Sequence, residues 1–181
     1  EGLGNKFLAN IREVDAIAEI VRVFENESIT HVHKKIDPIV DIGVINTELI
    51  LADLETVNRR TEKIRPNDPK TVIETSAVDK LKNGLQAGKL AIEVTLDNKE
   101  KVIARELNLL TNKKIIYVFN VSEKQLEEKW SPASLLFYHD RGKIIVDKNS
   151  NIGSDYVVLS TPFELTLSEA TLEDQQIYLQ E

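Results

Sequence analysis

The fold is best indicated by one stretch of the sequence, Lys114-Ile115-Ile116-Tyr117-Val118-Phe119-Asn120-Val121-Ser122-Glu123. Its first six residues form a short, mostly apolar run that directly follows a helical pattern, which is typical of a strand buried in a parallel sheet. Polar residues follow where this strand ends. Ligands of open parallel sheets bind at the carboxyl ends of the strands, so residues 120–123 are candidates for contacting a small molecule.

Helical and strand-like patterns alternate on both sides of this stretch. We expect strands at 16–24, 115–119, 143–146 and 156–159, and helices at 7–14, 98–110 and 172–179. The run 16–24 is rich in β-branched residues and predicts a mostly buried strand. Asp97 and Glu100 have the spacing of a capping box, which places a helix start between them. This alternation predicts an α/β protein with a parallel sheet.

A pair of helices separates the first two predicted strands. Apolar residues recur every three or four positions over 39–64, which predicts one long helix, and Asp37-Pro38 is suited to begin it. The prolines in 65–69 end this helix, and Val78, Leu81 and Leu85 mark a second one that ends near Gly84 or Gly88. We therefore expect an antiparallel helical hairpin at 39–90, inserted between two parts of the α/β domain, 1–38 and 91–181.

Composition limits the chemistry that the chain can perform. The 181 residues (20.5 kDa) carry a formal net charge of −7 and no Cys, so disulfides, thiol nucleophiles and zinc–thiolate sites are excluded. No apolar run reaches the roughly 18 residues of a membrane-spanning helix, and the first residues do not follow the pattern of a signal peptide. We expect a cytoplasmic protein without a membrane partner. Because the chain contains no Met, we also expect it to be a piece of a longer one.

Three minor features carry less information. His31 and His33 would face the same way in an extended segment, but without a third ligand they do not predict a metal site. The neighbours His139 and Asp140 form no catalytic constellation. Trp130 is expected to be a packing anchor before a helix capped by Ser131.

Several stretches of the sequence resemble those of the YchF or Obg-like ATPase family. The resemblance is carried by Gly2-Leu3-Gly4-Asn5-Lys6-Phe7-Leu8-Ala9-Asn10-Ile11-Arg12-Glu13-Val14-Asp15-Ala16-Ile17, by Asp37-Pro38-Ile39, and by Val44-Ile45-Asn46-Thr47-Glu48-Leu49-Ile50-Leu51-Ala52-Asp53-Leu54-Glu55. Leu107–Thr111 and Asn120–Glu123 extend it. It implies an incomplete P-loop NTPase domain with an inserted helical hairpin, related to the GTPases of the translation-factor class and lacking the family's C-terminal domain.

The resemblance also implies a base-binding site. The family carries Asn-x-x-Glu where GTPases have Asn-Lys-x-Asp, so ATP is expected to bind in preference to GTP. The residues implied at the base are Asn120, Val121, Glu123, Ser160 and Thr161. Pro162 stands where the family has Lys, so the match at Ser160 is partial. On turn chemistry alone, Asn120 is also a common turn residue, and the sequence pattern leaves both readings open.

The phosphate chemistry is expected elsewhere. In the family, the phosphate-binding loop and the motif that holds Mg²⁺ precede the segment matched by residues 1–7, so the catalytic residues and the ligands of Mg²⁺ are expected upstream of Glu1. Gly2, Gly4 and Asn5 then correspond to the second switch, where glycine allows mobility. We expect this chain by itself to be a poor ATPase.

The predicted end of the hairpin is basic. Residues 58–70 contain five basic and two acidic residues, a net charge of +3; the basic ones are Arg59, Arg60, Lys63, Arg65 and Lys70. They are candidates for contacting RNA or the ribosome, because phosphate contacts supply much of such binding. Basic residues at the C-terminal end of a helix are equally explained by the helix dipole. The alternative to a nucleotide-dependent switch is a non-enzymatic scaffold that uses this basic tip.

Overall fold

The computed structural model describes residues 4–26, 29, 36–65, 71–132 and 156–178. Packing divides the chain into two units, one formed by 1–17 and 43–115 and the other by 18–42 and 116–181. Several predicted features lie outside the described residues: Gly2, His31, His33, Lys70, the His139-Asp140 pair, the strand at 143–146 and the helix after Ser131. The functional division at residues 38 and 90 stays a prediction.

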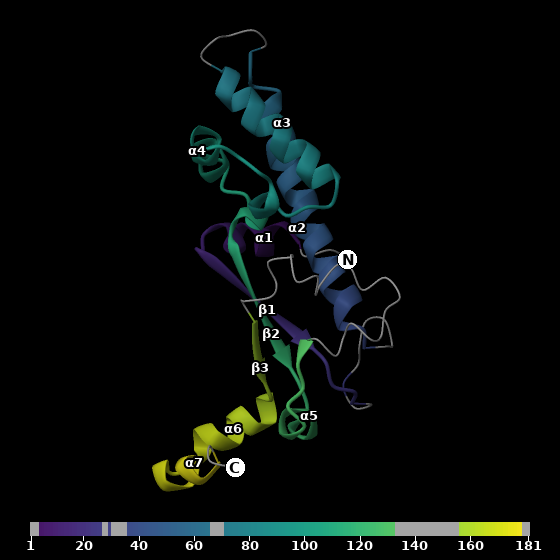
Figure 1. Cartoon of the computed structure of the whole chain (residues 1–181), viewed down its shortest axis with the longest axis vertical. Coiled ribbons are helices and arrows are strands. Elements are labelled where there is room, and N and C mark those ends of the chain that lie inside the picture. The colour runs from purple at the N-terminus through teal and green to yellow at the C-terminus, as the bar shows by residue number, and fades with distance from the viewer. Residues whose placement is uncertain (1–3, 27–28, 30–35, 66–70, 133–155, 179–181) are drawn as a thin grey trace. The chain divides into compact units, whose positions relative to one another are not determined.

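The first unit is built around the helical hairpin (Figure 1). Its long helix α2 (Pro38–Thr61) begins at the predicted residue, and the amide of Val40 donates to Oδ1 of Asp37 at 3.2 Å. Helix α3 (Val72–Gln86) runs back along it. The two apolar stripes form one buried cluster, whose members on α2 and α3 are Ile50, Val57, Val78, Leu81 and Leu85. The predicted antiparallel hairpin is confirmed.

Shorter helices complete this unit. They are α1 (Asn5–Arg12), the 3₁₀ turns η1 (Ala91–Glu93) and η2 (Leu110–Asn112), and α4 (Asn98–Glu106). Asp97 caps α4 by accepting from the amides of Lys99 and Glu100 at 2.7 and 2.9 Å, which confirms the predicted capping box. The prediction of one helix through 110 is wrong, because the left-handed backbone at Asn108 (φ 46°) separates α4 from η2.

Glu100 ties α4 to α3. Its carboxylate accepts from Nζ of Lys80 and from Oγ of Ser76, both at 2.7 Å, and from the amide of Asp97 at 2.8 Å. The hydrogen bonds from Lys80, Ser76 and Asp97, in that order of weight, lower the pKa of Glu100 to about 2. The carboxylate therefore stays ionised in mildly acidic solution, and the α3–α4 contact persists there.

Gly84 marks the closest approach in this unit. A Cβ at Gly84 would overlap the side chain of Val94, whereas a Cβ at Gly43 in α2 would meet no atom within 4 Å. We expect Gly84→Ala to lower the free energy of unfolding by about 1–3 kcal/mol, because overpacking outweighs the gain in helix propensity. Urea unfolding followed by circular dichroism measures the change.

Gly43→Ala is the matched control for this prediction. It makes the same substitution in an open helix interior, so it should raise the free energy of unfolding by up to about 1 kcal/mol. Equal effects of the two substitutions would contradict the close contact between Gly84 and Val94.

The second unit contains the sheet. Strands β1 (Ala16–Arg22), β2 (Lys114–Asn120) and β3 (Tyr156–Leu159) lie in the order β1-β2-β3. β2 and β3 pair in parallel, with Tyr117 opposite Tyr156 and Asn120 opposite Leu159. Helices α5 (Glu123–Glu127), α6 (Thr161–Glu169) and α7 (Leu172–Tyr178) follow the second and third strands. The predicted α/β class is confirmed.

The two predicted buried strands differ in burial. In β2, Tyr117 and Phe119 are buried, and the ring of Trp130 lies 5.4 Å from that of Phe119, as expected of a packing anchor. The prediction of a mostly buried strand at 16–24 is wrong, because β1 alternates and its Ile20 is 73% exposed. A continuous apolar run in the sequence can therefore form a strand of which only one face is buried.

Candidate functional site

The candidate site lies where β2 and β3 end side by side. The amide of Val121 donates to the carbonyl of Leu159 at 2.9 Å, which extends the pairing one residue beyond the strands. The amide of Thr161, the first residue of α6, donates to Oδ1 of Asn120 at 3.0 Å. The side chain of Asn120 therefore joins the two segments that contain all five predicted base-contacting residues.

This hydrogen bond orients the amide group of Asn120. Because Oδ1 accepts from Thr161, the side chain presents Nδ2 as its remaining polar group. In the part of the chain that the structure describes, Nδ2 makes no hydrogen bond. An oriented NH₂ group suits an acceptor on a planar ligand, such as a ring nitrogen of a purine.

Ser160 occupies an unusual position between β3 and α6. Its side chain is completely buried, and among the described residues its Oγ has no hydrogen-bond partner. It stands at the N-cap of α6 without making the capping hydrogen bond, while Thr161 beside it is exposed. The hydroxyl of Ser160 thus retains both its donor and its acceptor capacity. Ser160 directly follows Leu159, the residue opposite Asn120 in the sheet.

The other residues after β2 differ in what they can offer. Val121 is completely buried, and its amide already donates to the carbonyl of Leu159. The hydroxyl of Ser122 is occupied in a capping box with Gln125 at the start of α5. Glu123 is exposed on the first residue of that helix, and its carboxylate remains available to a ligand. Glu123 is therefore the exposed acid of this segment, and Asn120 is the half-buried amide beside it.

The predicted switch and tip residues lie in the first unit. Gly4 is the exposed N-cap of α1 with φ 69°, and Asn5 is the first residue of that helix. At the hairpin tip, Arg59 is 4.0 Å from Glu55 and Arg60 contacts Glu74, whereas Lys63 and Arg65 are exposed. Acidic neighbours thus engage part of the positive charge at the tip.

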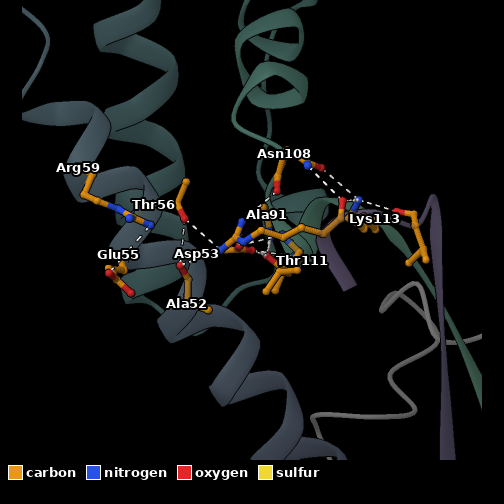
Figure 2. A network of polar contacts seen from close by, with 12 residues as sticks. Ala52, Asp53, Glu55, Thr56, Arg59, Ala91, Asn108, Thr111 and Lys113 are labelled. Atoms are coloured by element: carbon orange, nitrogen blue, oxygen red, sulfur yellow. Dashed lines mark hydrogen bonds and ion pairs between the residues drawn. The ribbon is translucent and has the colours of Figure 1, made fainter. Parts of the chain in front are cut away.

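The sequence did not reveal a buried polar network centred on Asp53 (Figure 2). Asp53 is completely buried, and its carboxylate accepts from the amides of Leu110 and Thr111 and from Oγ1 of Thr111, each at 2.7 Å. Burial raises the pKa of Asp53, and the hydrogen bonds oppose this rise. The sequence feature that could have revealed this network is the position of Asp53, three residues after Ile50 and four before Val57. This spacing places the acid on the buried stripe of α2.

A second buried carboxyl lies on β1. Glu19 shares the covered face with Ile17 and Val21, and among the described residues its Oε2 has no hydrogen-bond partner. Burial raises the pKa of Glu19 from its ordinary value of 4.5 to about 7. Within the described ranges, no three His, Asp or Glu residues cluster as metal ligands, and no helix is long and apolar enough to cross a membrane.

Comparison with known proteins gives a consistent result. No family model matches the chain. It is 37% identical to the ribosome-binding ATPase YchF of Bacillus subtilis, over the whole of this chain and 49% of that protein. It is 38% identical to the ribosome-binding ATPase YchF of Haemophilus influenzae, over the whole of this chain and 48% of that protein. The structure of the Schizosaccharomyces pombe YchF GTPase matches 96% of this chain and 47% of its own, with a TM-score of 0.76 and 29% identity. The chain spans about half the length of these relatives.

Proposed function

Because the chain belongs to the YchF family, we propose that it forms the base-binding part and the helical arm of an ATP-hydrolysing switch that acts on the ribosome. The observation that carries this proposal is the hydrogen bond between Thr161 and Asn120, which joins both base-binding segments at the end of the sheet. Such a switch would act in the cytoplasm, with ribosomes as its partner.

The residues at this edge would divide the recognition of adenine. Asn120 offers its NH₂ group to a ring nitrogen, and the exposed Glu123 accepts from an exocyclic amine. Val121 and Thr161 would contribute by fixing the site, because their amides donate to Leu159 and to Asn120, and the buried Ser160 lies directly beside Thr161. A P-loop hydrolase neutralises the phosphates with Mg²⁺ and a lysine, and we expect those groups to come from residues upstream of Glu1.

We expect Asn120→Ala to weaken binding of ATP about tenfold or more, because the change removes a hydrogen-bond donor and releases the amide of Thr161. The experiment is isothermal titration calorimetry with ATP and GTP in the presence of Mg²⁺, on the longest natural chain that contains these residues. Asn83→Ala, an exposed change on α3, is the matched control. Unchanged affinity for ATP in a folded Asn120→Ala protein would refute the assignment of the base site.

We expect the hairpin tip to bind ribosomes through charge. Replacing Arg59, Lys63 and Arg65 with alanine should lower the affinity for purified ribosomes about tenfold and make it less sensitive to salt, because fewer counterions are then released. Sedimentation with ribosomes at two salt concentrations measures both effects. The control replaces Lys99, Lys101 and Arg105, three exposed basic residues on α4.

The same assay separates the switch from the scaffold alternative. A switch predicts that ATP changes the affinity for ribosomes, whereas a scaffold binds ribosomes equally with and without ATP. Equal loss of affinity in the tip variant and the α4 variant would instead mean that the tip has no special role.

A further inference from the structure

Helix α1 is only loosely held by apolar packing. None of its described side chains is fully buried, and Phe7 is 52% exposed, while Leu8 and Ile11 are half-buried. Its N-cap is Gly4, which has a positive φ and makes no side-chain capping bond. An element with so little buried surface belongs to the part of a fold that opens at low cost.

The side chain of Arg12, at the C-terminal end of α1, contacts helix α2 and the turn that follows α4. The guanidinium of Arg12 donates to Oγ1 of Thr56 at 3.1 Å and to the carbonyl of Ala52 at 3.4 Å, both on α2. It also donates to the carbonyl of Asn108 at 3.1 Å. Three acceptors in different directions match the planar fork of arginine and would not be matched by lysine.

The backbone carbonyls at this end of α1 accept hydrogen bonds from two other side chains. Nζ of Lys113 donates to the carbonyls of Arg12 and Val14 at 3.1 and 2.6 Å, and Nδ2 of Asn108 donates to the carbonyl of Arg12 at 3.1 Å. Lys113 and Asn108 are joined to each other by a further bond at 3.1 Å (Figure 2). The end of α1 is thus attached almost entirely by polar contacts.

The buried carboxylate beside these contacts has hydrogen-bond partners of its own. Arg12 is 27% exposed and lies 4.0 Å from Asp53, whose carboxylate already accepts three shorter hydrogen bonds. Release of Arg12 into water would therefore leave Asp53 hydrogen-bonded. Asp53 thus has three hydrogen bonds that do not involve Arg12. Burial raises the pKa of Asp53, and the charge of Arg12 contributes by opposing this rise.

Chain order links this contact to both proposed binding sites. Lys113 directly precedes β2, and the last residue of β2 is Asn120. Thr56 lies on α2 three residues before Arg59 at the basic tip. We propose that Arg12 is a positioning residue whose contact with α2 couples ATP binding at the end of β2 to ribosome binding at the hairpin tip. This inference rests on the proposed function.

The test measures coupling rather than either affinity alone. The affinity for purified ribosomes is determined with and without ATP and Mg²⁺ for the wild-type protein, Arg12→Gln and Arg105→Gln, on the longest natural chain. Arg105 is exposed on α4, so its change removes one charge without touching the contact. We expect ATP to change ribosome affinity at least fivefold in the wild type and in Arg105→Gln, and less than twofold in Arg12→Gln.

Hydrogen exchange of the ligand-free protein supplies an independent readout. In Arg12→Gln, the amides of residues 8–12 should exchange at least tenfold faster, while those of α2 and α3 keep their protection. Unchanged exchange in α1, or full coupling in Arg12→Gln, would overturn the inference. If the wild type binds ATP and ribosomes independently, the inference fails while both binding sites stand. If it binds no ATP, the proposed function fails, and exchange alone decides whether Arg12 holds α1.

Discussion

Asp53→Ala is expected to lower the free energy of unfolding by about 3–5 kcal/mol, because it leaves buried donors without an acceptor. The amides of Leu110 and Thr111 lose their partner, as does the hydroxyl of Thr111. That hydroxyl also accepts from the amide of Ala91 at 2.9 Å, so the change reaches from α2 through η2 to η1. Urea unfolding followed by the fluorescence of Trp130 and by circular dichroism measures the loss.

Asp79→Ala provides the matched control, since it removes an exposed aspartate from α3. Its effect should stay within about 0.5 kcal/mol. Asp53→Asn keeps the size of the side chain but replaces one of its two acceptor oxygens with an NH₂ group. That NH₂ group would face a backbone N–H that needs an acceptor. We expect Asn to destabilise the protein almost as much as Ala. A cost below about 1 kcal/mol for both Asp53 variants would contradict the hydrogen-bond network.

The second large effect depends on pH. We expect Glu19→Gln to stabilise the protein at pH 8 by about 3 kcal/mol more than at pH 4, because burial raises the pKa of Glu19 to about 7. A carboxyl whose pKa is raised on folding favours the folded state in its protonated form. The wild type therefore retains this contribution below pH 4.5 and loses it as the pH rises through about 7, whereas glutamine has no charge to acquire.

The measurement is the free energy of unfolding of both proteins between pH 4 and pH 9. Glu106→Gln, an exposed change on α4, is the control and should give a difference that varies little over this range. A pH-independent difference between Glu19→Gln and the wild type would show that the Glu19 carboxyl is not buried as an acid on β1.

Local patterns in the sequence predicted the hairpin and the helix starts correctly. The repeat of apolar residues in 39–64, the Asp37-Pro38 start and the Asp97/Glu100 box each involve residues within one or two helical turns. Such signals are readable because the interacting groups are neighbours along the chain. The helix predicted through 110 failed at Asn108, where the backbone is left-handed; Asn, like Gly, commonly occupies such a position just after a helix, and this signal was outweighed by the apolar spacing.

The candidate site was predictable only in part. Asn120 was found from its place after a strand, but its hydrogen bond to Thr161 joins residues 41 positions apart. The contacts of Arg12 with Thr56 and Asn108 span 44 and 96 positions. Spacing along a helix or strand cannot show which distant groups meet, so Arg12, Lys113 and Asp53 became visible as a network only in the folded chain.

The alternation of β1 has a practical consequence for handling the protein. β1 stands at one end of the described sheet and carries an apolar side chain, Ile20, that is largely open to water. A strand of this kind is a template on which a second molecule can add its own backbone. Residues 1–181 should therefore associate at high concentration, and a charged residue in place of Ile20 should raise the concentration at which they stay in solution.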